Sequence, residues 1–343
     1  MRRYEILITD QDGKPKVVAG TNGTTLFNGS FSSTDKAGKT VPGALNIELD
    51  APISVYNSPL GGASLRVYGV GLPLLAQASN FNPSVDGTKY CNIQISCGMA
   101  KGLPLAKPSQ YGIILQSRIQ QAFGNWQGTS QTLDLIMIQP TGSFENPYNF
   151  TFSCPNNGFL GDAITTTLKK VFPTAQVNIS ISDRLVAPEA LETVYYSLDE
   201  FAAFLNEKSK SIVNDKTKKY PGIQITYINN IINVYDWTAP PAEKPIQIAF
   251  EDLIGQPTWI SPYTMTFKTT MRYDIKVGSQ VIMPQKSAQR GLILTNAAAQ
   301  SQYKETVDFQ GTFNVQMVRH VGNFRQGDAN SWVTLYQVYI PPA

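Results

Sequence analysis

The sequence predicts a mainly β protein whose middle part is an α+β domain. Three patterns carry this prediction, two of them strand-like and one helical. In residues 1–141, apolar and polar side chains alternate with the period of two that is typical of a strand with one wet face, as in Leu45, Ile47 and Leu49. In residues 242–343 the same alternation recurs at Phe313, Val315 and Met317. Between these two β-rich arms, residues 197–213 place their apolar side chains at helical spacing.

The N-terminal arm, residues 1–141, contains several predicted strands. Tyr4, Ile6 and Ile8 alternate toward the turn dipeptide Asp12-Gly13, which predicts an opening hairpin with residues 16–18. Further strands are predicted at residues 45–50, 63–69, 91–97, 111–119 and 132–138. Strands in this number, separated by turn signals, are enough to close a small barrel or sandwich.

The middle of the chain changes character at residues 144–159, which are rich in Asn, Pro and Phe. This composition predicts a break in regular structure and a domain boundary. Apolar residues at helical intervals then predict a helix that ends before Pro173, and Val177, Ile179 and Ile181 predict a short strand.

A second helix begins with a capping box. The Ser197 hydroxyl is expected to accept the amide of Glu200, whose side chain reaches back to the cap amide. The apolar stripe of this helix is formed by Phe201, Phe204, Leu205 and Ile212. Two alternating segments flank Asn229-Asn230 and predict a hairpin, which makes the middle unit a small α+β domain.

A proline-rich segment, residues 238–245, predicts a linker, because clustered prolines cannot continue a sheet. Beyond it, strands are predicted at residues 246–250, 263–271, 276–283, 309–318 and 332–340. Residues 285–304 are polar and Ala-rich, and either a loop or a short helix fits them. The predicted domains are therefore 1–143, 144–238 and 239–343. The alternative is that the middle unit is inserted into the N-terminal β domain, which would then be discontinuous.

Composition argues against a DNA-binding domain and shows an unusually low content of charged residues. The net charge of +3 is too small for the footprint of a DNA-binding domain. The densest basic cluster is Lys208, Lys210, Lys216, Lys218 and Lys219. This cluster lies at the C-terminal end of the second helix, where positive charge complements the helix dipole. The alternative is that it contacts a phosphate. Charged residues make up only 15% of the chain, which fits either wet subunit interfaces or merely polar loops.

The three cysteines, Cys91, Cys97 and Cys154, are expected to be reduced. Cys91 and Cys97 lie on one face of a predicted strand but roughly 20 Å apart at about 3.3 Å per residue, so they cannot bond each other. We expect no signal peptide, because Thr9, Asp10 and Asp12 interrupt the apolar run behind Arg2 and Arg3. No uncharged apolar run reaches membrane-spanning length.

No catalytic, cofactor-binding or metal-binding residue is predicted. His320 is the only histidine and no Gly-x-Ser-x-Gly or Cys-x-x-Cys pattern accompanies it, so a packed, hydrogen-bonded histidine is expected. The adjacent acids Asp199-Glu200 and Glu251-Asp252 are carboxylate candidates, but the first pair lies in the first turn of a helix. Trp126, Trp237, Trp259 and Trp332 are scattered, which favours core packing over a sugar platform.

Three segments carry a resemblance to a known family. The first is Gly98-Met99-Ala100-Lys101-Gly102-Leu103-Pro104-Leu105, which leads into the strand at Tyr111. The second covers residues 125–135, where a strand re-emerges after a tight loop. The third is residues 313–323 followed by Trp332-Val333-Thr334. Together they resemble the baseplate hub proteins of contractile-tailed bacteriophages.

The resemblance implies a non-enzymatic structural protein of the virion with two tail-tube-like β-barrels in one chain. It implies a homotrimer whose six barrels form a pseudo-sixfold ring, which joins a sixfold tail tube to a threefold central spike and lines the channel for DNA and the tape-measure protein. Partners would be the tube or tube-initiator protein, the spike, the baseplate wedge proteins and the tape-measure protein, with assembly in the host cytoplasm and no sequence-specific nucleic-acid binding. The alternatives are a tail-associated glycan hydrolase and a glycan-binding receptor module.

Overall fold

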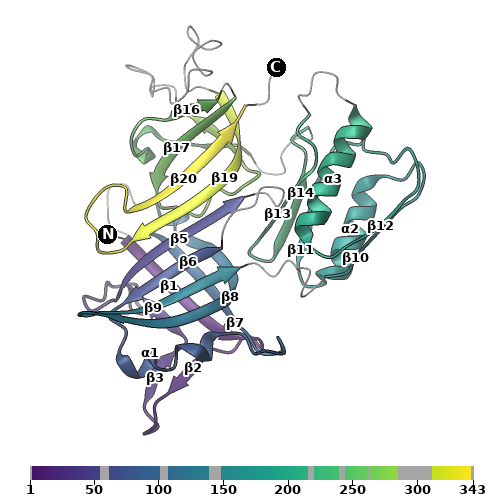
Figure 1. Cartoon of the computed structure of the whole chain (residues 1–343). Coiled ribbons are helices and arrows are strands. Elements are labelled where there is room, and N and C mark those ends of the chain that lie inside the picture. Colours follow the sequence, from purple (N-terminus) through teal and green to yellow (C-terminus); the bar gives the residue numbers. More distant parts are fainter. Residues whose placement is uncertain are drawn as a thin grey trace.

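The computed structural model describes residues 2–54, 62–100, 107–138, 148–214, 220–238, 244–261, 263–284 and 311–340. Strands dominate them, and both arms contribute to a single 13-stranded sheet, so the prediction of a mainly β protein is confirmed. Figure 1 shows the two arms stacked on one side of the molecule and the middle unit on the other.

In its described residues, the N-terminal arm holds nine strands and three short helical turns. The strands are β1 (Arg2–Asp10), β2 (Val17–Ala19), β3 (Thr25–Asn28), β4 (Ser30–Ser32), β5 (Asn46–Ser54), β6 (Ala63–Tyr68), β7 (Cys91–Met99), β8 (Gly112–Gln127) and β9 (Ser130–Ile138). The helical turns are α1 (Leu72–Leu75), η1 (Ala78–Phe81) and η2 (Pro108–Gln110). Seven of the strands are hydrogen-bonded in the order β5-β6-β9-β8-β7-β1-β4, and β2 pairs with β3 in a separate ribbon.

This part of the sheet curls around its own core, because alternate residues of each strand point inward. Tyr4, Ile6 and Ile8 of β1 are fully buried, and α1 and η1 add Leu74 and Phe81 to the same core. Where α1 crosses β8, a Cβ on Gly124 would lie 2.8 Å from the backbone oxygen of Leu75. Only glycine therefore lets α1 close this end of the arm.

The part of the C-terminal arm that the structure describes holds six strands and one helical turn. They are β15 (Ile246–Gln247), η3 (Phe250–Asp252), β16 (Thr258–Ser261), β17 (Thr264–Thr270), β18 (Gln280–Met283), β19 (Gly311–Asn323) and β20 (Trp332–Tyr339). Their pairing order is β16-β17-β20-β19-β18-β15. A second core, which includes Trp259, Met265, Phe313 and Tyr336, lies against this part of the sheet.

The two arms repeat one strand order. Along the chain, β5, β6, β7, β8 and β9 correspond to β16, β17, β18, β19 and β20, and the pairing orders β5-β6-β9-β8-β7 and β16-β17-β20-β19-β18 match strand for strand. All these neighbours are antiparallel. The flanking strands differ, because β1 is antiparallel to β7 whereas β15 is parallel to β18.

The repeat extends to the register of individual residues. β8 is bulged between Ile119 and Gln121 where it pairs with β9, and β19 is bulged between Val315 and Met317 where it pairs with β20. Two backbone hydrogen bonds also correspond: Gly69 N–H to Gln131 O at 2.8 Å and Met271 N–H to Trp332 O at 3.1 Å. Ala63 lies opposite Met137 of β9, and Met265 lies opposite Val338 of β20, so Ala63 and Met265 are equivalent positions. The donor Gly69 lies six residues after Ala63, and the donor Met271 lies six residues after Met265. A bulge is a local irregularity with its own geometry, so its recurrence at the same register indicates one fold used twice.

The middle unit lies between the two arms in the sequence and has three layers. Its elements are β10 (Phe150–Cys154), α2 (Leu160–Val171), β11 (Gln176–Ser180), β12 (Leu191–Tyr195), α3 (Leu198–Val213), β13 (Gln224–Ile228) and β14 (Ile231–Tyr235). The two helices lie between the β10–β12 ribbon and the β11-β14-β13 sheet, which faces the arms (Figure 1). Phe150 and Phe201 stack in its core with ring centroids 5.6 Å apart.

Several local predictions are confirmed. α2 ends before Pro173, and α3 begins at Ser197, whose hydroxyl accepts the Glu200 amide at 3.3 Å. The Glu200 carboxylate accepts from the amide of Tyr196, one residue before the predicted cap amide. The turn between β13 and β14 is Asn229-Asn230, both with positive φ as a tight hairpin turn requires.

Other local predictions are wrong. Residues 144–159 were expected to break regular structure, yet they contain β10, because Phe150, Phe152 and Cys154 alternate inward with polar residues between them. β12 and β16 were not predicted. The opening hairpin is short: Lys16 N–H still donates to Ile8 O, but residues 17–19 then pair with β3 instead of β1.

Residues 285–304 and residues 239–243 of the linker lie outside the described residues.

Among the helices of the described residues, none is both long enough and apolar enough to cross a membrane.

Candidate functional site

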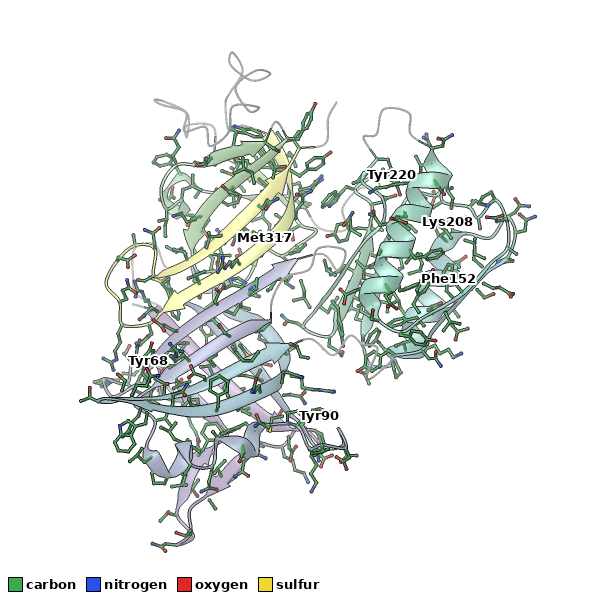
Figure 2. The ribbon with its side chains drawn as sticks, in the orientation of Figure 1. Tyr68, Tyr90, Phe152, Lys208, Tyr220 and Met317 are labelled. Atoms are coloured by element: carbon green, nitrogen blue, oxygen red, sulfur yellow. The ribbon has the colours of Figure 1, made fainter. Side chains whose placement is uncertain are left out.

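The two arms are joined by a β ladder between β5 and β19. It runs from Met317 opposite Ser54 to Asn323 opposite Glu48, and Phe324 N–H extends it with a hydrogen bond of 3.0 Å to Ile47 O. Figure 2 labels Met317 at this joint, where the C-terminal strands meet β5. β19 therefore pairs with β18 and β20 of its own arm and with β5 of the other, which makes the two arms one continuous sheet.

The outer face of the joint is polar and its charges are paired. Arg319 binds Asp50 with two hydrogen bonds of 2.7 and 2.5 Å, and Asn323 donates to Glu48 at 2.9 Å. On the neighbouring strands, the Arg66 guanidinium lies 2.5 Å from Asp134. A groove of about 540 Å³ runs over this face, and its acidic lining residues are Glu48, Asp50, Asp134 and Asp328. The Arg319–Asp50 and Arg66–Glu48 pairs are about half-exposed on both sides, so each of these two is expected to contribute no more than about 1 kcal/mol.

The loop between β19 and β20 is fastened to the N-terminal arm by Arg2. Its guanidinium donates to the backbone oxygens of Asn323 (2.6 Å), Asp328 (2.9 Å) and Gln326, and to Ser331 Oγ at 2.9 Å. A fork of five N–H donors can satisfy several carbonyl groups at once, which a lysine could not do with the same geometry. The first strand of the chain thereby fixes the loop that precedes the last strand.

The core of the N-terminal arm includes two residues of the C-terminal arm, Trp332 and Met271. The Trp332 indole N–H donates to Gly98 O at 3.0 Å. Gly322 lies under the same ring, where a Cβ would come within 2.9 Å of Trp332 Cζ3. The joint is thus a shared core as well as a shared sheet.

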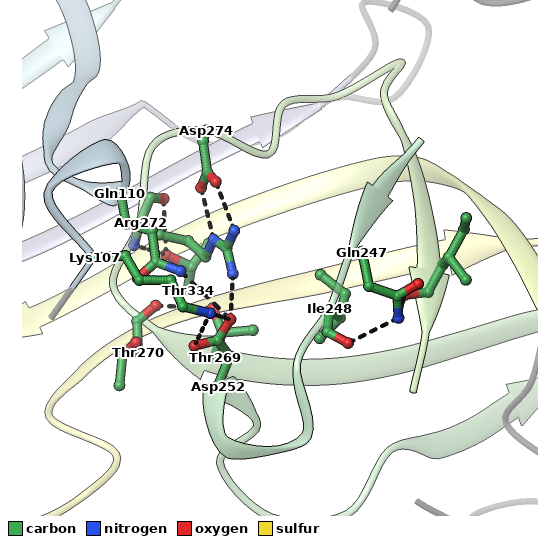
Figure 3. A network of polar contacts seen from close by, with 11 residues as sticks. Lys107, Gln110, Gln247, Ile248, Asp252, Thr269, Thr270, Arg272, Asp274 and Thr334 are labelled. Carbon is green, nitrogen blue, oxygen red and sulfur yellow. Dashed lines mark hydrogen bonds and ion pairs between the residues drawn. The ribbon is translucent and has the colours of Figure 1, made fainter. Parts of the chain in front are cut away.

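A buried ionic network crosses the joint on another side (Figure 3). Asp252 and Arg272 are both almost fully buried and lie 3.0 Å apart, and Arg272 also binds Asp274 with two hydrogen bonds of 2.6 Å. From the N-terminal arm, Lys107 Nζ reaches Asp252 at 3.2 Å and Gln110 Nε2 at 3.4 Å. Burial would lower the pKa of Arg272, but the hydrogen bonds and charge of Asp274 outweigh it and raise that pKa.

The network continues to His320 of β19. Thr334 Oγ1 accepts the amide of Arg272 at 3.1 Å and lies 3.0 Å from His320 Nδ1. His320 is buried, and burial lowers its pKa to about 3, so the imidazole is neutral near pH 7. The expectation of a packed, hydrogen-bonded histidine is confirmed.

The middle unit is attached to the arms through the β13–β14 turn. Asn229 Oδ1 accepts the amide of Gln116 at 2.8 Å, and Asn229 Nδ2 donates to Ile113 O at 3.3 Å. One side-chain amide thus bonds the edge of β8 as a paired strand would. Ile228 beside it is buried in the core of the C-terminal arm. This turn therefore contacts both arms.

The other residues singled out by the sequence are dispersed. Cys91, Cys97 and Cys154 are free and buried, and burial raises the pKa of each. Asp199 and Glu200 lie in the first turn of α3, as expected. Lys208 pairs with Glu189 at 2.9 Å, and Lys216, Lys218 and Lys219 lie outside the described residues.

The four tryptophans do not form a platform. Trp259 and Trp332 are buried in different cores, whereas Trp126 is 65% exposed. No three His, Cys, Asp or Glu side chains of the described ranges are grouped so that they could hold a metal ion.

Sequence reasoning missed the residues that make the joint. Asp252 was considered only as one of two adjacent acids, and its partner Arg272 was not considered. No local signal pairs them, because they are twenty residues apart on different segments and Lys107 comes from the other arm. Arg2 was considered only as part of the N-terminal segment.

No protein-family model matches the chain, and no curated protein matches it. Solved structures that resemble it are tail proteins and secretion components. One is an E. coli component of the type VI secretion system, described as structurally similar to tail proteins of bacteriophage T4 (8% identity, 88% of this chain and 75% of that one, TM-score 0.49). A 43 kDa prophage tail protein from Shewanella oneidensis has 6% identity, 98% coverage of both chains and a TM-score of 0.48. A tail protein from Neisseria meningitidis has 9% identity, 98% and 96% coverage and a TM-score of 0.46.

These neighbours are of the kind that the resemblance to baseplate hub proteins implies.

Proposed function

We propose that this protein is a structural baseplate hub protein of a phage tail. It would form a trimeric, pseudo-sixfold ring that connects the tail tube to the central spike and lines the channel for DNA and the tape-measure protein. The observation that supports this most is the repeated strand order of the two arms, held in one fixed relation by the β5–β19 ladder.

A repeated fold within one chain suits an adaptor between two symmetries. Three copies of a chain with one barrel offer three equivalent surfaces, whereas three copies with two similar barrels offer six. Such a ring needs the two barrels of each chain to keep a constant orientation. The shared core at Trp332 and the contacts of Lys107 and Gln110 with the buried Asp252 support that rigidity.

The proposal includes the division of the chain into a barrel at 1–143, an α+β domain at 144–238 and a second barrel at 239–343. It includes the partners and the location in the virion that the resemblance implies, and a role without turnover. In support of the last point, Asp252 is occupied by Arg272, Lys107 and Gln110, so it is a poor general acid or base.

Size-exclusion chromatography with light scattering tests this, on the chain alone and mixed with its spike partner. The expected result is a trimer in at least one of the two samples. Electron microscopy of that trimer should show a ring with threefold outer and near-sixfold inner symmetry. A chain that stays monomeric with its spike would refute the proposal.

A further inference from the structure

The two arms and the middle unit meet around one small cavity. Its volume is about 10 Å³, which is roughly the space that a single water molecule needs. All three parts of the chain line it, through Ile113 and Ile114 of β8, Ile228 and Asn229 of the β13–β14 hairpin, and His320 of β19. Most of the lining side chains are apolar, and none of those that the structure describes is acidic.

His320 brings a ring nitrogen to this cavity that needs a hydrogen-bond partner. The side chain is only 3% exposed, so both of its nitrogens have to be satisfied inside the protein. A neutral imidazole has one donor nitrogen and one acceptor nitrogen. Nδ1 lies 3.0 Å from Thr334 Oγ1. For Nε2, the described part of the chain supplies no backbone or side-chain partner.

Thr334 determines which nitrogen of His320 carries the proton. Its hydroxyl donates to Arg272 O at 3.4 Å and accepts the Arg272 amide at 3.1 Å. A hydroxyl has a single hydrogen, so Thr334 Oγ1 can only accept from the imidazole. Nδ1 is therefore the protonated nitrogen of the neutral ring, and Nε2 is an acceptor that requires a donor.

We infer that this cavity binds one water molecule, which donates a hydrogen bond to His320 Nε2. Asn229 supplies a donor for the oxygen of the water, because its side-chain amide has two N–H groups and bonds Ile113 O with one of them. Water fits the site better than an ion does. A chloride ion is larger than a water molecule, and Lys276 at the cavity wall opposes a cation.

The bound water links elements that belong to different parts of the chain. His320 lies on β19, the strand that joins the two arms, and Asn229 attaches the middle unit to β8. A water with partners on both residues therefore belongs to the framework of the junction. This inference goes beyond the proposed ring and does not depend on it.

The test uses the full chain and its single histidine. A high-resolution crystal structure should show an ordered water about 3 Å from His320 Nε2. In protein labelled with 15N-histidine, long-range 1H–15N NMR correlations near neutral pH should show a proton on Nδ1 and none on Nε2. With one histidine in the chain, both nitrogen resonances are assigned without ambiguity.

A cavity-filling variant checks that the water bonds Nε2. Val277→Ile adds a methyl group to the cavity wall and should displace the water, which should shift the Nε2 resonance. Val281→Ile is the matched control, because Val281 is buried in the same core but is not among the described residues that line the cavity. It should leave that resonance at its wild-type position.

Four results would overturn the inference. They are a crystal structure with a protein donor at Nε2, one with no water beside it, a proton on Nε2, and an unchanged Nε2 resonance in folded Val277→Ile. The first three come from the wild-type chain, so they decide the matter even if the variant does not fold.

Discussion

At the scale of single residues, burial decides how much each ion pair of the joint contributes. Arg319 and Asp50 meet in nearly ideal bidentate geometry, yet both are about half exposed, so water and salt screen their attraction. Arg272 and Asp252 are almost fully buried, so removing either one leaves a buried charge with one counter-ion fewer. Although the two pairs have similar N–O distances, removing one partner should therefore reduce the free energy of unfolding far more for the buried pair than for the exposed pair.

We expect Asp252→Ala to lower the free energy of unfolding by about 3–5 kcal/mol, because it leaves the buried Arg272 charge with one carboxylate instead of two. The matched control Asp50→Ala should cost at most about 1 kcal/mol. Urea unfolding of both variants measures the difference. Equal losses in the two variants would show that the buried network does not support the joint.

His320 predicts how stability depends on pH. Burial lowers the pKa of the folded-state imidazole to about 3, whereas an unfolded histidine titrates near 6.5. The contribution of the neutral His320 to the free energy of unfolding is therefore complete above about pH 6.5. It is lost as the pH falls toward 3, because the unfolded chain takes up the proton first. The loss approaches about 1.4 kcal/mol per pH unit.

Urea midpoints at pH 7.5, 6.5 and 5.5 measure this effect above the range where most carboxylates titrate. His320 is the only histidine, so His320→Gln should flatten the profile over this interval. A wild-type midpoint that does not change between pH 7.5 and 5.5 would be incompatible with a buried neutral imidazole.

At the scale of elements, the β13–β14 turn holds the middle unit against β8 through one side chain. Asn229 and Asn230 both have positive φ, which glycine adopts without strain. Glycine at either position therefore removes the side-chain hydrogen bonds and leaves the turn intact. Only Asn229 bonds the N-terminal arm, because Asn230 bonds Thr174 O and Tyr227 within its own unit.

Asn229→Gly should accelerate hydrogen exchange of the Gln116 amide by an amount that corresponds to about 1 kcal/mol, the net value of a typical hydrogen bond. Asn230→Gly is the matched control and should leave that amide unchanged. Exchange measured by NMR or mass spectrometry resolves the two. If both variants accelerate it equally, the middle unit is held by something other than this side chain.

The elements themselves were predictable where a local pattern exists. The Ser197 cap, the stop at Pro173 and the turn at Asn229-Asn230 are local signals, and each one stands where it was predicted. The β5–β19 ladder was not predictable, because alternation shows which face of a strand is buried and not which distant strand it pairs with. The duplication was hidden for the same reason: matched positions such as Ala63 and Met265 share burial and register but not identity.

At the scale of the whole molecule, the two arms form one sheet with interlocked cores. Trp332 belongs to the last strand of the chain but packs in the core of the N-terminal arm, where β1 and β7 also lie. Arg2 at the other end of the sequence fixes the loop that precedes Trp332. The arms should therefore unfold together, whereas the middle unit has a separate core.

Trp332→Ala tests this coupling. Removing a buried tryptophan should cost about 3–5 kcal/mol, and the loss should appear as faster hydrogen exchange in β7 of the N-terminal arm as well as in β20. Peptides from α2 and α3 should keep their wild-type exchange, because the helices lie in the other core. The exposed Trp126→Ala is the control for loss of an indole without loss of core packing. Faster exchange confined to β20 would mean that the arms are separate units, and the fixed relation of two barrels on which the proposed ring depends would lose its physical basis.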